Sequence, residues 1–432
     1  MNKRSGPSDS EVIISSSSSR VSDCVDIVRE ILSRLPVKSL MRFKCVSKHW
    51  KFSICQDQGL IDLHFTRSKQ RCSDLFIVVP RYDKVDPFRL RMLHSGLTTS
   101  VGAMEYTYRE SFLVPNFFGS RAINERKSEQ NKPLHYTEIL KPVNGLICFV
   151  NRNIDSVCIL NPSTRELTPW IASSFRGNKR YNFTAELRTY CFGFDPATKQ
   201  HKVICMRKVR ELKTDICEVL TVGDNTWRRI DDKVPLFTSD VYQVSSVYSN
   251  GFIYWGDRSY GIPRYLNAFD VGCEKFEVIK VPKEITEQCK YPKGGYCVPL
   301  HRLLEVGGHI ALLQRWTDKV VKLWICEDDD TCNGSYSKWN GVNMDLPFQW
   351  WGFGKNSRSA YFHGVAREDR IIIESYPSNS ARLYMKNVSL YSYDWKKNTS
   401  TKAKTGVVSE FAYVSFLTSF TESLYPVLKV QT

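Results

Sequence analysis

The sequence predicts a small all-α module followed by a large all-β domain built as a β-propeller. Three observations predict it. Apolar residues have helical spacing between residues 23 and 66, short apolar runs alternate with turn residues after residue 66, and a strand unit recurs along that second part. The chain has 432 residues, 42% of them hydrophobic, which is enough material for two domains of unequal size.

The N-terminal 22 residues are predicted to form a disordered tail. They include an unbroken serine run from Ser15 to Ser19, and such a composition buries too little apolar surface to offset the entropy of ordering. After the tail, a helical i, i+3, i+4, i+7 series begins, ending before Pro36, which cannot continue a helix. The series consists of Val28, Ile31, Leu32 and Leu35.

A second apolar series after Pro36 also has helical spacing, with basic residues at many of the remaining positions. Its members are Val37, Leu40, Phe43, Val46, Trp50 and Ile54. Two or three short helices are therefore expected. About 45 residues of helix form a weak core alone, so the module should lean on a partner or on the next domain. Periodicity leaves two alternatives open, a docking module and a structural cap.

The residues themselves favour docking. The string from Asp26 to Trp50, with Leu35-Pro36 at its centre, closely resembles the F-box of plant F-box proteins. That resemblance implies packing against a Skp-type adaptor, which bridges to a cullin. It gives as adaptor-contact candidates Ile31, Leu35, Pro36, Leu40, Val46 and Trp50. Family members usually carry a second apolar-Pro pair ahead of the first helix, where this chain has Asp23-Cys24.

The second part, residues 67–432, repeats a turn followed by an apolar strand. The turns around Gly145, Gly251 and Gly308 are spaced by about two periods and then one, and Gly193 is predicted to mark the intervening unit. Each unit continues into a second strand and a polar turn, and a late copy begins at Ile371. A repeat of about 50 residues, all strand, resembles the kelch-type propeller period and leaves room for about six or seven blades.

A pair of β-sandwiches is the alternative architecture. Four segments favour the propeller because they resemble motifs of the plant F-box-associated domain. These are Lys141–Cys148, Asn161–Glu166, Phe192–Asp195 and Asn250–Trp255. The predicted fold is thus an F-box at residues 23–66 and a kelch-like, F-box-associated β-propeller at 67–432.

No catalytic, cofactor or metal site is predicted. The fourteen cysteines are scattered without a CxxC pair, and the eight histidines show no zinc-site spacing. Cys148, Cys158, Cys205 and Cys326 lie in apolar runs, where a thiol behaves as a small hydrophobic group. The cysteines and the lack of an export signal favour a reducing compartment, cytoplasmic or nuclear.

Partners are constrained by charge and hydropathy. No apolar run approaches the roughly 20 residues that a membrane span needs. The net charge of +16 makes an acidic partner conceivable, but the basic residues are scattered and no nucleic-acid-binding motif accompanies them, so no nucleic-acid partner is expected.

The resemblance to plant F-box proteins implies a substrate-recognition subunit of an SCF-type (Skp-cullin-F-box) ubiquitin ligase that binds a protein substrate. Aromatic and arginine residues typical of binding hot spots give the substrate-contact candidates Arg315, Trp316, Trp350 and Trp351, with packing between blades as the alternative role. The alternative function is a ligand-binding or enzymatic propeller whose N-terminal helices are a structural cap.

Overall fold

The computed structural model describes most of both predicted parts. The described residues are 25–71, 74–80, 88–96, 105–113, 138–174, 188–209, 214–224, 226–230, 234, 246–256, 263–287, 301–317, 319–327, 338–348, 358–367, 370–377, 389–402 and 416–428. The predicted tail, residues 1–22, lies outside them.

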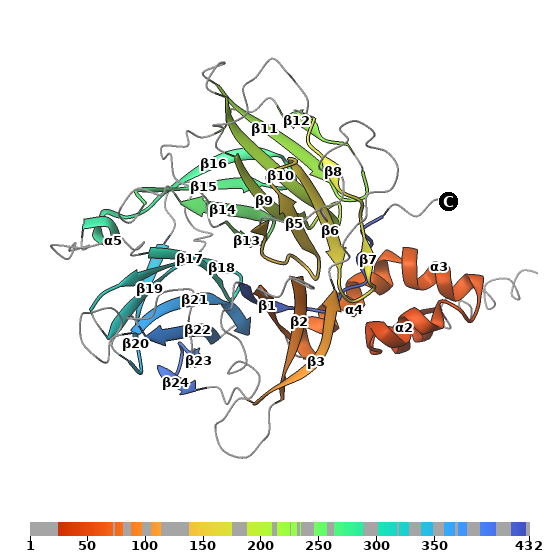
Figure 1. The fold of residues 1–432 in the computed structure, drawn as a ribbon, viewed down its shortest axis with the longest axis horizontal. Coiled ribbons are helices and arrows are strands. Elements are labelled where there is room, and N and C mark those ends of the chain that lie inside the picture. The colour runs from red at the N-terminus through yellow and green to blue at the C-terminus, as the bar shows by residue number, and fades with distance from the viewer. Residues whose placement is uncertain are drawn as a thin grey trace, which may run out of the picture.

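The N-terminal module is helical, as predicted (Figure 1). It contains a helix at residues 25–32, α2 (Val37–Phe43), α3 (Lys48–Gln56) and α4 (Gln58–Arg71). Pro36 is the N-cap of α2 rather than the end of the first helix, and the Ser47 side chain caps α3 by accepting from the Trp50 amide at 3.2 Å.

The helical part ends later than expected, since α4 continues to Arg71 instead of stopping near residue 66. This helix is mostly polar, and its few inward residues, such as Leu60, Ile61 and Phe65, are buried. A helix with so narrow an apolar face gives only a weak periodic signal in the sequence.

The remainder is all β and forms six sheets in the described part of the chain. Paired neighbours are antiparallel throughout. In order across each sheet, the first sheet contains β25 (Phe416–Phe420), β1 (Asp74–Pro80), β2 (Phe88–Gly96) and β3 (Glu105–Leu113), and the second contains β4 (Glu138–Ile139), β5 (Ile147–Asn151), β6 (Ser156–Asn161) and β7 (Glu166–Leu167), with β8 (Ile171–Ala172) also on β6. The third sheet contains β12 (Arg228–Ile230), β11 (Thr214–Thr221), β10 (Gln200–Val209) and β9 (Arg188–Asp195), and the fourth contains β13 (Val247–Ser249), β14 (Phe252–Gly256), β15 (Tyr265–Asp270) and β16 (Lys275–Lys280). The fifth sheet contains β17 (His301–Val306), β18 (His309–Arg315), β19 (Val320–Glu327) and β20 (Lys338–Asp345), and the sixth contains β21 (Arg358–Arg367), β22 (Arg370–Pro377), β23 (Ser389–Asp394) and β24 (Thr399–Lys402). A short helix, α5 (Lys283–Glu287), follows β16.

The sheets are arranged as a β-propeller, which confirms the predicted fold class (Figure 1). Contacts run from β9 to β13, β13 to β17, β17 to β21 and β21 to β25. Because β25 comes from the C-terminal part of the chain and pairs with β1, the first sheet joins the two ends of the domain. Such closure removes the exposed edges of an open array of sheets.

Many strand-to-strand turns share one side-chain device. An Asn or Asp begins the turn and its side chain accepts backbone N–H groups two or three residues later, while the fifth residue adopts positive φ. The first and fifth residues are Asn151 and Asp155, Asn161 and Arg165, Asp195 and Lys199, Asp270 and Glu274, and Asp394 and Asn398. The polar turns predicted after the second strand of each unit at Asn161 and Asp270 are therefore confirmed.

The predicted phase of the repeat is wrong for one unit. Gly145, Gly251 and Gly308 have positive φ in turns between strands, but Gly193 lies inside β9. The corresponding turn follows Asp195 and is built without glycine. Gly193 instead allows close packing between sheets, because a Cβ there would lie 2.7 Å from Val271 and 2.8 Å from Ile253.

The hydrophobic core is shared between the two parts. One buried cluster contains helical residues such as Leu40, Leu60 and Phe65 together with propeller residues such as Leu146 and Tyr425. Other clusters fill the spaces between successive sheets. The cysteines predicted to be structural are buried free thiols; burial raises the pKa of Cys158 and of Cys205 to about 12.

Replacing Gly145 by alanine should destabilise the protein more than the same change at Gly251. Both positions have positive φ, but a Cβ at Gly145 would collide with Ser423 and lie 2.6 Å from the Thr421 carbonyl oxygen, whereas at Gly251 it would meet only Pro196 at 3.2 Å. We expect Gly145→Ala to cost about 1–3 kcal/mol more, measured by urea unfolding. Equal losses for the two variants would contradict this packing.

Candidate docking surfaces at opposite ends of the molecule

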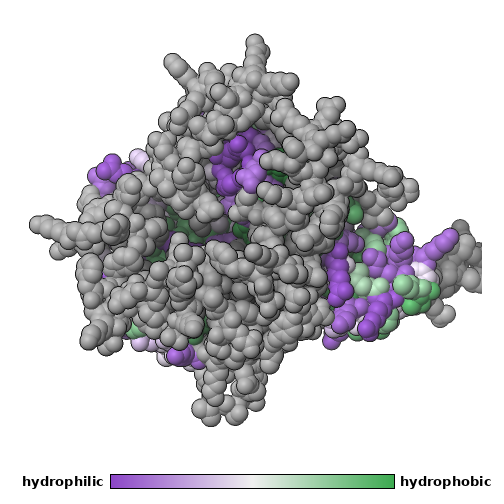
Figure 2. Space-filling model, in the orientation of Figure 1, coloured by the Kyte–Doolittle hydropathy of each residue, from purple (hydrophilic) through white to green (hydrophobic). Residues whose placement is uncertain are grey.

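The helical module exposes large apolar side chains to solvent. In the described part of the chain, five of the nine exposed large hydrophobic residues belong to it: Val25, Ile27, Ile31, Val46 and Phe52. Figure 2 shows hydrophobic residues on the surface of the helical module, at the right of the view. Exposed apolar side chains concentrated on one small unit mark an interaction site more often than isolated ones do.

The helix at residues 25–32 has apolar residues on two sides. Leu32 is buried and Val28 packs against the core, whereas Ile27 and Ile31, one helical turn apart, are 60% and 55% exposed. The residues on the inner side pack against the core. The outer pair contributes nothing to the core of this chain and is available to a partner.

Ion pairs hold this helix in place. Arg67 of α4 binds both carboxylate oxygens of Glu30, at 2.6 and 2.5 Å, and donates to the Glu30 backbone carbonyl at 2.9 Å. Hydrogen bonds from Arg34 and Arg67 hold the pKa of Glu30 below its usual range. Arg29 pairs with Asp57 at 3.0 Å. The orientation of Ile27 and Ile31 is therefore fixed by these ion pairs together with the inner packing of Val28 and Leu32.

The six residues predicted to contact an adaptor occupy different environments. Ile31, Pro36 and Val46 are exposed, while Leu35 and Trp50 are partly buried, Trp50 with its ring edge-on to Phe43 at 5.4 Å. Leu40 is fully buried in the core, so its predicted surface contact is wrong. Leu40 belongs to the same apolar series as the exposed candidates, and the spacing of that series does not show which of its members face the core and which face solvent.

Three exposed residues of the same module were not predicted: Val25, Ile27 and Phe52. Ile27 carried a usable signal, because it lies four residues before Ile31 on the helix. Val25 and Phe52 fall outside the periodic series used to assign the helices.

The module covers one end of the propeller. Antiparallel strands place the β4–β5, β6–β7 and β9–β10 turns at the same end, which we call the short-turn end. Contacts with the helices come from this end: Lys199 lies 3.6 Å from Asp62, and Lys44 lies 3.8 Å from Glu166. At the opposite end, which we call the long-connection end, the last strand of one sheet ends and the first strand of the next begins, as at β12 and β13, β16 and β17, and β20 and β21.

The C-terminal segment, residues 421–428, joins the helices to the propeller. Tyr425 donates a hydrogen bond to Asp62 of α4 at 2.8 Å, and its ring lies edge-on to Phe65, Phe194 and His201, with centroids 5.2 to 5.5 Å away. Burial raises the pKa of the Tyr425 hydroxyl, which therefore remains a donor. Burial also lowers the pKa of His201 to about 3, so this imidazole is neutral.

The C-terminal segment also forms hydrogen bonds with the propeller. Asn161 donates from its side-chain nitrogen to the carbonyls of Ser423, at 3.0 Å, and Tyr425, at 2.8 Å. Ser163 accepts from the Ser423 amide at 3.1 Å. On the helical side, Glu422 accepts from the Val37 amide at 3.4 Å. Helices and sheets are thus linked through one stretch of backbone.

At the long-connection end, one predicted substrate contact in the described part of the chain, Trp316, is exposed. It follows β18 and is 41% exposed, and the Lys322 ammonium lies 4.6 Å from its ring centroid. Arg315 is partly buried beside it. Trp350 and Trp351 lie outside the described residues, so the structure brings only the first pair of the four together.

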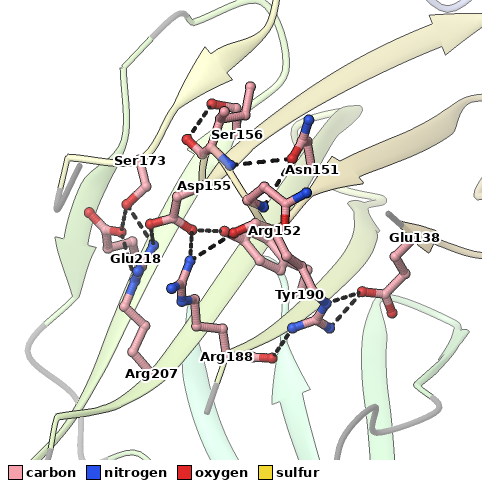
Figure 3. Close-up of polar contacts among 12 residues, drawn as sticks. Glu138, Asn151, Arg152, Asp155, Ser156, Ser173, Arg188, Tyr190, Arg207 and Glu218 are labelled. Atoms are coloured by element: carbon pink, nitrogen blue, oxygen red, sulfur yellow. Dashed lines mark hydrogen bonds and ion pairs between the residues drawn. The ribbon is translucent and has the colours of Figure 1, made fainter. Parts of the chain in front are cut away.

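A buried charged network lies near the same end (Figure 3). The Arg207 guanidinium, fully buried on β10, lies 2.6 Å from Asp155 and 3.7 Å from Glu218 and donates to the Ser173 hydroxyl at 2.7 Å. Ser173 in turn donates to Glu218 at 2.7 Å. Arg188 and the Tyr190 hydroxyl also contact Asp155. The network joins the second and third sheets, a structural role that no sequence motif indicated.

The described part of the chain shows two further features. No helix in it has the length and apolar character needed to cross a bilayer. Nor do three or more His, Cys, Asp or Glu side chains come together there in an arrangement that would hold a metal ion.

Comparison with known proteins matches both parts of the chain. The F-box domain family matches residues 24–60, and the F-box associated beta propeller domain family matches residues 110–424. Three similar F-box proteins of Arabidopsis thaliana are 30, 29 and 29% identical to this chain. The alignments cover 70, 81 and 81% of this chain and 85, 77 and 81% of the respective relatives.

The chain is an F-box protein with an F-box associated β-propeller domain. An F-box of this kind implies binding to a Skp-type adaptor, and the two domains together support a general substrate-recognition role in SCF complexes. The specific kelch relationship stays a prediction.

Solved structures resemble this F-box protein only weakly. A nidogen/laminin complex aligns with a TM-score of 0.39 at 10% identity, covering 81% of this chain and 99% of that chain. A virginiamycin B lyase from Staphylococcus aureus aligns with a TM-score of 0.35 at 6% identity, covering 79% and 87%. Neither similarity is high enough to support an argument about function.

Arg207→Ala should strongly destabilise the F-box protein, because it would leave Asp155 and Glu218 buried beside a cavity. We expect a loss of about 3–5 kcal/mol in the free energy of unfolding. Lys397→Ala is the matched control; this lysine is 77% exposed and pairs with Asp394 at 3.9 Å, so its loss should cost less than about 1 kcal/mol. Similar small losses for both variants would contradict the role of the network.

Tyr425→Phe should loosen α4 on the propeller while keeping the ring contacts. The variant removes the hydrogen bond to Asp62, and hydrogen bonds to charged groups contribute about 1.5–3 kcal/mol, at the low end here because Asp62 is partly exposed. Hydrogen exchange of the α4 amides should accelerate. Tyr265→Phe, at a residue 51% exposed on β15, should leave that exchange unchanged.

Proposed function

We propose that this F-box protein is the substrate-recognition subunit of an SCF-type E3 ubiquitin ligase and links a protein substrate to ubiquitination. The observation that carries the proposal is the exposed apolar side of the first F-box helix, at Ile27 and Ile31, held in place by Arg67 and Glu30. A Skp-type adaptor binds there, and through it a cullin.

The placement of the two ends supports this division of roles. The helical module occupies the short-turn end, so the long-connection end of the propeller points away from the adaptor-binding helices. Substrates bind at that free end, where Trp316 is exposed and Arg315 is adjacent. Trp and Arg are enriched among residues that dominate binding energy at interfaces.

The mechanism is proximity. The F-box holds the ligase scaffold, the propeller holds the substrate, and the effective concentration of substrate lysines near the charged ubiquitin-conjugating enzyme rises. This chain acts as a non-catalytic adaptor, and ubiquitin transfer takes place elsewhere in the assembly. We place this activity in the cytoplasm, the nucleus or both.

The proposed organisation has three parts: a tail at residues 1–22, the F-box module beginning at residue 23, and the propeller. We place the boundary between the last two after Arg71, where α4 ends, rather than after residue 66.

A second candidate is a ligand-binding or enzymatic propeller with the helices as a structural cap. One observation favours it: the helices and the propeller share a single buried cluster that includes Leu40, Phe65 and Tyr425. The two candidates differ in what they require of the outer side of the helices. A cap needs no partner there.

Ile31→Asp tests the proposal through adaptor binding by the full chain. Because Ile31 is 55% exposed and outside the core, the variant should fold with an unchanged unfolding midpoint. It should bind a purified Skp-type adaptor at least about ten-fold more weakly, as expected for an apolar hot spot replaced by a charge. Val278→Asp, at a residue 57% exposed on β16, is the matched control and should bind normally.

Failure of the native chain to bind the adaptor would refute the proposal and favour the cap. So would an adaptor affinity that Ile31→Asp leaves unchanged.

A further inference from the structure

Four side chains at the long-connection end of the fifth sheet share one face. Gln314 on β18 and Lys322 on β19 are cross-strand partners, and therefore point to the same side. Trp324 lies two residues after Lys322 on β19, and Trp316 two residues after Gln314. The cluster comprises an exposed indole, a lysine, a buried indole and a buried carboxamide.

Lys322 is held in a defined position by two indole rings. Its ammonium lies 4.6 Å from the Trp316 ring centroid and 4.1 Å from that of Trp324. Within the part of the chain that the structure describes, no carboxylate forms an ion pair with it. The indole faces orient the cation by cation–π attraction, and its N–H donors have no strong acceptor among the residues that the structure describes.

Gln314 adds a second donor, with no acceptor in the described part of the chain. The side-chain oxygen accepts from Trp324 Nε1 at 2.7 Å, which sets the orientation of the carboxamide. The other end, Nε2, is buried and has no hydrogen-bond partner among the described residues, while Gln314 as a whole is 1% exposed. A buried donor left in this state costs about 1–3 kcal/mol, and such groups are rare in folded proteins.

Backbone hydrogen bonds and close packing support this arrangement. The Trp316 amide donates to the Val320 carbonyl at 3.0 Å, and Thr317 Oγ1 accepts from the Val320 amide at 2.9 Å. On the neighbouring strand, Gly341 leaves space for the two side chains, because a Cβ there would lie 2.8 Å from the Trp324 ring and 2.9 Å from Lys322 Cε. Support of this kind positions Lys322 and Trp324 before a ligand binds, while the exposed Trp316 side chain is able to change its rotamer.

We propose that Gln314, Lys322 and Trp316 form an oxyanion-binding site for a carboxylate or phosphate group carried by the substrate. This inference rests on the proposed function, since it names the substrate chemistry for the end of the propeller opposite the F-box. Lys322 supplies the charge, Gln314 supplies an N–H donor, and the exposed Trp316 ring shifts to admit the ligand. The net charge of +16 complements an acidic partner.

Other ligand classes fit these groups less well. A cationic ligand would have to displace Lys322 from both indole faces and would leave Gln314 Nε2 without an acceptor. A purely apolar ligand would cover both donors and satisfy neither. An oxyanion is the class that satisfies the two donors together.

Titration with inorganic phosphate tests the site on the intact chain. The indole ¹⁵N–H signal of Trp324, assigned by comparison with Trp324→Phe, should shift in a saturable manner, with sodium chloride at equal ionic strength as the reference. Lys322→Met keeps the side-chain stem and should weaken phosphate binding about ten-fold, whereas Lys322→Arg should retain it. Lys397→Met, at an exposed lysine, is the matched control and should behave as the native chain.

Peptides that differ only in a central phosphoserine, glutamate or glutamine then distinguish the source of the oxyanion. Preference for phosphoserine or for glutamate over glutamine, lost in Lys322→Met, would support the site and identify the group. Absence of a saturable phosphate shift, or an equal shift in Lys322→Met, would overturn it. Adaptor binding by the same samples reports on the proposed function separately, so the two failures are distinguishable.

Discussion

The contact made by the C-terminal segment is the interaction on which the rest of this structure depends. Strand β25 joins the first sheet, and the residues that follow it lie between the helices and the propeller. Tyr425 touches α4 through Asp62 and Phe65 and touches the third sheet through Phe194 and His201. Residues 416–428 therefore close the sheet array and carry the F-box module, so a change that displaces them should affect both features.

This contact gives a physical basis for the proposed division of roles, with the adaptor at the helical end of the molecule and the substrate at the long-connection end of the propeller. An F-box on a loose linker would raise the effective concentration of a substrate only modestly, because the linker samples many positions. Here the helices share a buried core with the propeller, and Ile27 and Ile31 face outward from that shared core. Trp316 and Lys322 belong to the other end of a sheet array whose short-turn end is occupied. In the proposed function, the separation between adaptor and substrate would then be set by packing rather than by chain length.

Features encoded in neighbouring residues of the sequence were predicted, whereas contacts between distant segments were not. Turn chemistry at Asn161 and Asp270 is visible in the sequence because each turn carries its own hydrogen-bond acceptor. The phase error at Gly193 arose because a glycine that permits close packing between sheets looks the same as one in a turn. Leu40 was misplaced for a related reason, since periodicity shows that a helix has an apolar side but not which partner covers it. The Tyr425–Asp62 contact and the Arg207 network join distant segments, and no local pattern encodes either.

The central claim is that the F-box helices present their outer side to an adaptor while the C-terminal segment holds the propeller in one fixed orientation. Cryo-electron microscopy of the full chain bound to a Skp-type adaptor and the N-terminal part of a cullin tests it most directly. We predict adaptor density against Ile27 and Ile31, one propeller orientation with Tyr425 on α4, and the Trp316 end directed away from the adaptor. Adaptor density on the propeller, or a propeller that takes many orientations relative to the helices, would contradict the account.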